Sequence, residues 1–142
     1  MQAQLAERAK ELQIDDHVHF IGNQNQQALA QLNAHAAVVL SPLTGRALSE
    51  AALGAAAIVA YDLDWQRDLI ESGKTGELVP FRRPDLLGAA AIRLLEYPQY
   101  AASMGAAVRA RALTILDPES LNEHERQEYA KVMRMFRRGG TA

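Results

Sequence analysis

The chain has 142 residues, and its hydrophobic fraction of 49% is ample for the core of one domain. Fifteen Lys and Arg stand against seventeen Asp and Glu, and the net charge of -2 excludes the broad basic surface that a nucleic-acid partner would require. The absence of cysteine excludes disulfide frameworks, thiolate zinc sites and thiol nucleophiles.

The amino-terminal segment predicts neither export nor membrane insertion. It is mostly polar and lacks the apolar run after a basic start that a secretory signal needs. No stretch approaches the roughly 20 apolar residues that cross a bilayer. We therefore expect a cytoplasmic protein. Peripheral attachment to the inner face of a membrane, through another part of a larger protein, is compatible with this sequence.

The first predicted elements are a helix and a strand. Apolar residues recur at helical spacing over residues 1–12, before a polar turn at 15–16. Residues 17–21, with the sequence HVHFI, stop at Gly22 and are typical of a short strand. The two histidines alternate on that strand, but no third ligand is evident, so no metal site is expected.

The middle of the chain alternates helices and strands. A helix is predicted over 26–35, with its leucines on the inner face. The apolar run 36–40 is typical of a strand buried on both faces of a parallel sheet. After a loop the pattern returns to helix over 46–55, and 57–61 predicts a second, fully apolar strand.

The rest of the chain is predicted to be mainly helical. Asp64 is expected to cap a helix that ends at 72–73, and a short strand follows at 76–79. Prolines then separate three helices, predicted over 85–96, 99–116 and 118–135. Three arginines near the end, Arg134, Arg137 and Arg138, indicate a solvated tail, with contact to acidic lipids as the alternative.

This alternation predicts an α/β fold, a Rossmann-like doubly wound parallel sheet with helices at the carboxyl end. Ligands of such sheets bind beyond the carboxyl ends of the strands. The loops expected there are 22–25, 41–46, 62–65 and 80–83.

The loop 41–46 has the most distinctive chemistry. Thr44 and Gly45 directly precede a helix, where free backbone N–H groups and the positive end of the helix dipole suit a phosphate, and Arg46 adds a cation. A plain N-cap followed by a surface arginine explains the same residues. Glu50 lies one turn further and is either the surface partner of Arg46 or a ligand for paired hydroxyls, as acidic residues are for a ribose. Spacing alone does not choose between these alternatives.

The stretch from Glu50 to Pro80, EAALGAAAIVAYD followed by DLIESGKTGELVP, resembles the carboxyl-terminal domain of GT-B glycosyltransferases, in particular the large retaining group called family four or group one. The segments HVHFIG at 17–22, LLEYP at 94–98 and MG at 104–105 extend the similarity to roughly nine tenths of the chain. The resemblance implies a single nucleotide-sugar-binding domain over 1–142, without the family's first strand and acceptor domain.

The resemblance also implies roles for particular residues. Glu50 matches the glutamate that binds the nucleotide ribose, Thr44, Gly45 and Arg46 match the loop on the diphosphate, and Gly22 matches a glycine that approaches the nucleotide. The family's other glutamate falls on Pro42, and no carboxylate lies between Ser41 and Ser49. Paired glycines are replaced around Trp65, for which packing is favoured over stacking on a ligand.

The function implied is sugar transfer with retention, of the hexosyltransferase type, from a nucleotide diphosphate sugar, in glycan biosynthesis. The acceptor, a glycan or a lipid-linked molecule, would be bound by the missing domain, so the isolated chain is expected to be inactive. No metal or other cofactor is expected. The alternative is a non-catalytic Rossmann-like interaction module that kept the fold. A flavodoxin-like receiver is disfavoured because the strand ends lack an acidic cluster.

Overall fold

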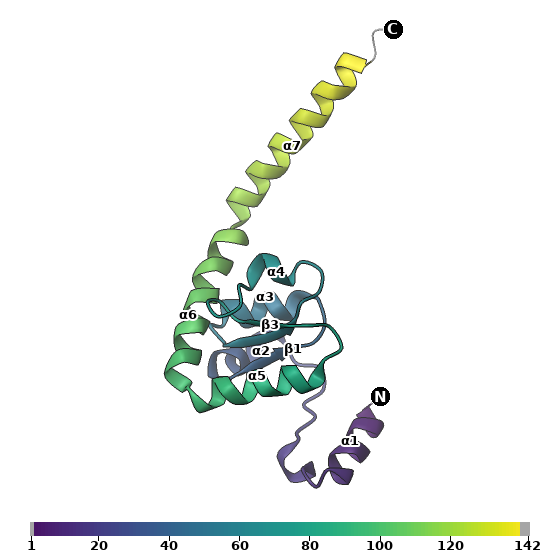
Figure 1. The fold of residues 1–142 in the computed structure, drawn as a ribbon. Helices are drawn as coiled ribbons and strands as arrows, with labels where there is room; N and C mark the ends of the chain where they lie inside the picture. The colour runs from purple at the N-terminus through teal and green to yellow at the C-terminus, as the bar shows by residue number, and fades with distance from the viewer. Residues whose placement is uncertain (1, 140–142) are drawn as a thin grey trace.

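The computed structural model describes residues 2–139, with side chains through residue 136, so Arg137 and Arg138 lie outside the described side chains. The described chain contains a sheet of three parallel strands in the order β1-β2-β3, with helices on both faces (Figure 1). The strands are β1 (Val39–Ser41), β2 (Ile58–Tyr61) and β3 (Glu77–Val79). The predicted Rossmann-like α/β architecture is thereby confirmed.

Seven α-helices and one 3₁₀ helix are formed by the described residues: α1 (Gln2–Glu11), η1 (Asp15–His17), α2 (Gln26–His35), α3 (Arg46–Leu53), α4 (Gln66–Leu69), α5 (Pro84–Glu96), α6 (Pro98–Ile115) and α7 (Pro118–Gly139). Several begin where the sequence predicts. Asn25 caps α2 by accepting a hydrogen bond from the Ala28 N–H at 2.8 Å. The last three helices each begin with proline, whose missing N–H costs nothing in the first turn.

The core has two halves, one on each face of β2. Ile58 and Ala60 face the helices α3 and α6, whereas Val59 and Tyr61 face α5, as the twofold alternation of a strand requires. All four residues are buried, which confirms the predicted fully apolar strand. Helix α6 contributes to both halves, because its amino-terminal part packs with α5 and its carboxyl-terminal part with α3.

The predicted strand at 17–21 is wrong. Asp15 to His17 form the 3₁₀ helix η1, in which the Val18 N–H binds the Asp15 carbonyl, and the following residues run as an exposed loop. His17 and His19 therefore do not alternate on a strand. A strand forms only when a neighbour satisfies its backbone groups, and no strand among residues 2–139 pairs with the outer edge of β1.

The predicted burial of β1 on both faces is also wrong. Because β1 is an edge strand, Leu40 remains 48% exposed although Ser41 is buried. Helix α2 packs against α3, and Leu32 on α2 is exposed as well. Helix α4 has only four residues, and its N-cap position is taken by Trp65, not by Asp64 as predicted.

Helix α3 ends in a Schellman motif with an unusual residue at its left-handed position. The Ala56 N–H binds the Ala51 carbonyl and the Ala55 N–H binds the Ala52 carbonyl, which places Ala55 at φ 59°. Alanine is strained there because its Cβ approaches the following carbonyl.

We expect the substitution Ala55→Gly to raise the free energy of unfolding by about 1 kcal/mol, because glycine adopts this conformation without strain. Urea denaturation measures the change. Ala106→Gly, at an exposed site within α6, is the matched control and should lower the stability by about 1 kcal/mol. A loss of stability in both variants would contradict the strain at Ala55.

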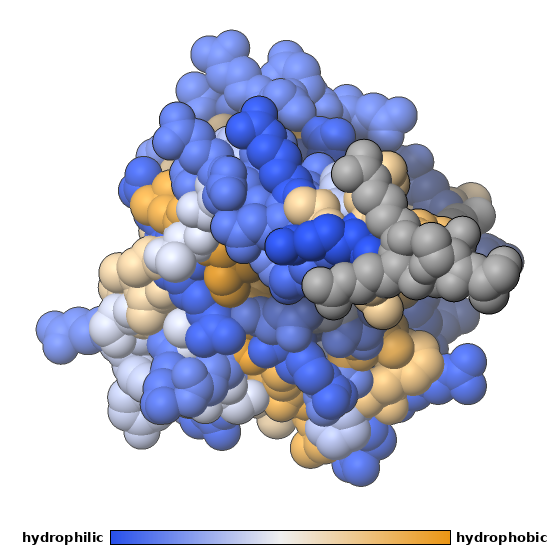
Figure 2. All heavy atoms as spheres, turned by 90° about the horizontal axis from the view of Figure 1, so that it is seen from above, coloured by the Kyte–Doolittle hydropathy of each residue, from blue (hydrophilic) through white to orange (hydrophobic). Residues whose placement is uncertain are grey.

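The two ends of the described chain extend away from the sheet. Helix α1 is joined to the body by the extended segment after η1, and α7 projects from the end of α6 (Figure 1). In the view from above, hydrophilic side chains dominate the surface, with apolar residues in patches between them (Figure 2). Among the described helices, none is both long enough and apolar enough to span a membrane.

Candidate functional site

The start of α3 has the geometry of an anion site. Gly45 occupies its N-cap position with φ 151° and ψ 179°, a conformation that is essentially restricted to glycine. Within the described part of the chain no side chain caps the start of this helix, and Thr44, Gly45 and Arg46 are all exposed. The Leu48 N–H already donates to the Gly45 carbonyl at 3.2 Å, whereas the N–H groups of Gly45, Arg46 and Ala47 donate no hydrogen bond within the described residues. These three N–H groups lie at the positive end of the helix dipole and can bind an anion.

Arg46 and Glu50 form a contact along α3. The Arg46 Nη2 lies 3.5 Å from the Glu50 Oε1, and the two side chains are 79% and 31% exposed. Arg46 thus reaches toward Glu50 along the helix while its side chain remains largely exposed to solvent. Such surface pairs contribute only ~0.3–0.5 kcal/mol, so an anion at the helix start would have little to overcome in recruiting this arginine.

Glu50 also lines a cavity of about 470 Å³ between three helices. That size lies within the range of small-molecule sites. Helix α2 contributes Gln26 and α6 contributes Arg109, and the remaining lining is mostly apolar: Leu29, Ala30, Ala34, Leu53 and Gly54. An apolar wall beside a carboxylate and two polar side chains suits a nucleoside, which has a flat ring and adjacent hydroxyls.

Sequence reasoning missed both Gln26 and Arg109. Each lies on the polar side of an ordinary helix, and no local pattern distinguishes it from its neighbours. They reach the cavity of Glu50 only because α2 and α6 pack against α3. Only a prediction of which helices pack together would have found them.

Gly22, the remaining candidate from the sequence, lies in the loop between η1 and α2 with φ 63°. It does not follow a strand, and it is not among the residues that line the cavity of Glu50. Gln26 lies four residues after Gly22, begins α2 and does line that cavity.

The loop before α3 is held by a buried side chain from outside the sequence motif. The Ser41 Oγ donates to the Leu43 carbonyl at 3.2 Å, and the Gln66 Nε2 donates to the same carbonyl at 3.1 Å. Gln66 is the first residue of α4 and is completely buried. Sequence reasoning missed it, because the two partners are 23 positions apart.

Near the loops after β2 and β3, charged side chains form local ion pairs with each other. Arg67 pairs with Asp62 at 2.9 Å, and Arg83 donates two hydrogen bonds to Asp85 at 2.9 and 2.6 Å. Hydrogen bonding from Arg83 lowers the pKa of the Asp85 carboxyl. Trp65 packs against the core beside α3, which agrees with the predicted packing role.

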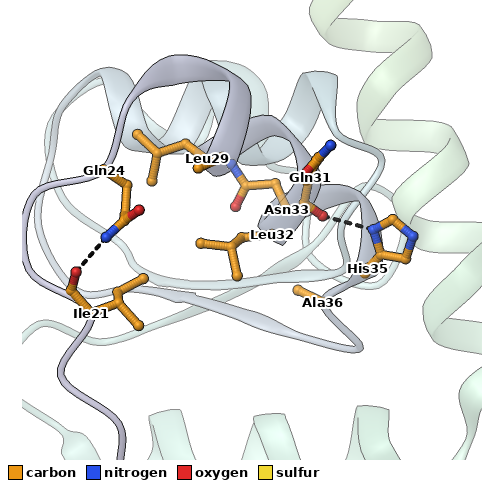
Figure 3. Close-up of a pocket in the computed structure, with 9 residues that line it drawn as sticks. Ile21, Gln24, Leu29, Gln31, Leu32, Asn33, His35 and Ala36 are labelled. Carbon is orange, nitrogen blue, oxygen red and sulfur yellow. Dashed lines mark hydrogen bonds between the residues drawn. The ribbon is translucent and has the colours of Figure 1, made fainter.

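A larger cavity of about 1070 Å³ lies elsewhere, between α2 and the loop that precedes it (Figure 3). Its lining is mainly apolar and includes Ile21, Leu29 and Leu32. Gln24 donates to the Ile21 carbonyl, and the His35 Nδ1 lies 2.8 Å from the Gln31 carbonyl (Figure 3). No lysine or arginine lines this cavity, so it lacks the chemistry of a diphosphate site.

Comparison with known proteins relates this chain to glycosyltransferases. The family described as "Glycosyl transferases group 1" matches residues 1–111. Phosphatidyl-myo-inositol mannosyltransferases of Mycobacterium tuberculosis and Mycobacterium bovis are 32% identical over 122 residues, which cover 77% of this chain and 32% of each relative. The chain thus spans about a third of the length of the curated relatives it matches.

Solved structures share the fold. Sucrose-phosphate synthase from Thermosynechococcus elongatus superimposes with a TM-score of 0.81 at 22% identity, covering 94% of this chain and 34% of that one. Anabaena HepE in complex with UDP-glucose gives a TM-score of 0.79, also at 22% identity, over 91% of this chain and 36% of HepE.

Proposed function

The chain belongs to the glycosyl transferases group 1 family, and we propose that it binds the nucleoside diphosphate part of a sugar donor, with the diphosphate at the start of α3 and the ribose on Glu50. The observation that carries this proposal is the open, glycine-capped helix start one turn before a carboxylate that lines a cavity. HepE, which has the same fold, was solved with UDP-glucose.

The proposed chemistry follows from charge. When the bond between the sugar and the diphosphate of the donor breaks, negative charge develops on the departing diphosphate. Fixed N–H donors and a cation stabilise this charge. In this proposal, Thr44, Gly45 and Arg46 supply these donors and this charge. No carboxylate lies between Ser41 and Ser49 to hold a metal beside the phosphates, which supports stabilisation by amides and charge instead of by a metal. Gly22 would contribute from the loop that leads to Gln26.

The rest of the proposal concerns the whole enzyme. We propose that this domain serves a retaining hexosyltransferase, in which the acceptor is held by a second domain and the reaction takes place between the two. The curated relatives are named for a lipid substrate, which supports a lipid-linked acceptor and a location at the membrane surface. This chain alone should bind nucleotides weakly and transfer little or no sugar.

Titration of the labelled chain with UDP, GDP and ADP, followed by amide chemical shifts, tests the binding. We expect saturable shifts at Gly45 and Glu50 for at least one diphosphate, and smaller shifts with the matching nucleoside, which lacks the anion. Gly22 should shift if its loop contacts the base. Absence of any shift with all three nucleotides would overturn the proposal and favour a non-catalytic interaction module.

A further inference from the structure

The amide of Gln66 is buried in an unusual state. Its Nε2 donates to the Leu43 carbonyl at 3.1 Å, whereas its Oε1 has no partner within the described chain. Reversing the amide would place that oxygen against the carbonyl oxygen of Leu43, so the orientation is fixed by the bond to Leu43. Folded proteins satisfy nearly all buried polar atoms, and an exception calls for a physical reason.

The bond determines which way the next amide points. The peptide joining Leu43 and Thr44 is trans and planar, so its carbonyl and its N–H point in opposite directions. The Leu43 carbonyl faces two buried donors, Ser41 and Gln66. The Thr44 N–H therefore points away from these two donors, two residues before α3 begins, and it donates no hydrogen bond within the described residues.

We infer that Gln66 is a positioning residue that keeps the Thr44 N–H directed at the diphosphate. This inference rests on the proposed function. Gln66 itself would not touch the ligand, because its side chain is completely buried beneath the loop. On this view, the side-chain amide of Gln66 is needed for its Nε2 donor, and the Oε1 of the same amide is left without a partner.

The test substitution is Gln66→Met, which preserves the length of the side chain and removes both the donor and the unpaired oxygen. Thermal stability should be unchanged or higher, because no buried acceptor remains without a partner. Affinity for UDP should fall about tenfold, because one amide bond to a charged phosphate is lost. Affinity for uridine should not change. A purely structural role would instead lower stability and weaken both ligands together.

The control is Gln127→Met, the same change at an exposed position on α7, which should leave both affinities as in the wild type. Amide spectra of the free protein give a second readout, since loss of the Gln66 bond should shift the Thr44 resonance. In the wild type, UDP should shift the Gln66 side-chain amide together with Thr44, and this measurement needs no variant.

The failures are distinguishable. If wild-type protein shows no shift at Thr44 or Gly45 with any nucleotide, the proposed function fails. If UDP binds but the Gln66 side-chain amide does not respond, or Gln66→Met binds UDP as the wild type does, the positioning role of Gln66 is overturned and the proposed function stands.

Discussion

Replacing Gly105 by alanine should destabilise the chain by about 3 kcal/mol, a large part of the total stability of a small domain. A Cβ built on Gly105 would lie 2.0 Å from the Ala55 carbonyl oxygen and 2.9 Å from the Ala55 carbonyl carbon. Both are backbone atoms of the turn between α3 and β2, so neither can rotate away. Helix α6 would have to move off the sheet.

The neighbours of Gly105 explain why that movement is costly. Met104 and Val108 on α6 are almost completely buried, each in a different half of the core. Shifting α6 far enough to clear the new methyl group would therefore open both halves, and overpacked cores lose stability in this way. The loss should exceed by far the gain of about 1 kcal/mol that alanine brings to a helix.

Gly88→Ala is the matched control. Gly88 lies within α5, and a Cβ built there meets nothing within 4 Å. This variant should gain about 1 kcal/mol from helix propensity alone. Urea denaturation of both variants gives the comparison. Equal stabilities of Gly105→Ala and the wild type would show that α6 does not rest on the turn at Ala55.

The helices and the central strand were predictable because their signals are local. Prolines at the starts of α5, α6 and α7 and the apolar run of β2 each fix an element within a few residues. The strand expected at 17–21 failed because strand formation depends on a partner that no local pattern reveals. The burial expected for β1 failed for the same reason, since position at the edge of a sheet is a property of the whole fold.

The residues of the candidate site also fall into two groups, those close together in the sequence and those brought together only by packing. Gly45, Arg46 and Glu50 lie on one loop and one helix, so their spacing alone places them near each other. Gln66 and Arg109 reach the same region only through the packing of α4 and α6, and side chains brought together by packing leave no trace in local spacing. The residues missed are therefore those that support or surround the motif.

Glu50→Gln should weaken UDP binding by about 10- to 100-fold, the second large effect expected. A carboxylate accepts hydrogen bonds from both ribose hydroxyls, and bonds to a charged group contribute ~1.5–3 kcal/mol. The neutral amide keeps one acceptor and loses the charge. Stability should hardly change, because the partner of Glu50 is the exposed Arg46, at 3.5 Å. Calorimetry and thermal unfolding measure the two quantities separately.

The sharper form of this prediction compares UDP with 2′-deoxy-UDP. Wild-type protein should prefer UDP. Glu50→Gln should lose most of that preference, because the 2′-hydroxyl contributes to binding through its hydrogen bond with the Glu50 carboxylate. Glu96→Gln, which removes the same charge from the exposed end of α5, should retain the preference. If Glu50→Gln discriminates between the two nucleotides as the wild type does, Glu50 is only the surface partner of Arg46. The ribose must then be bound elsewhere.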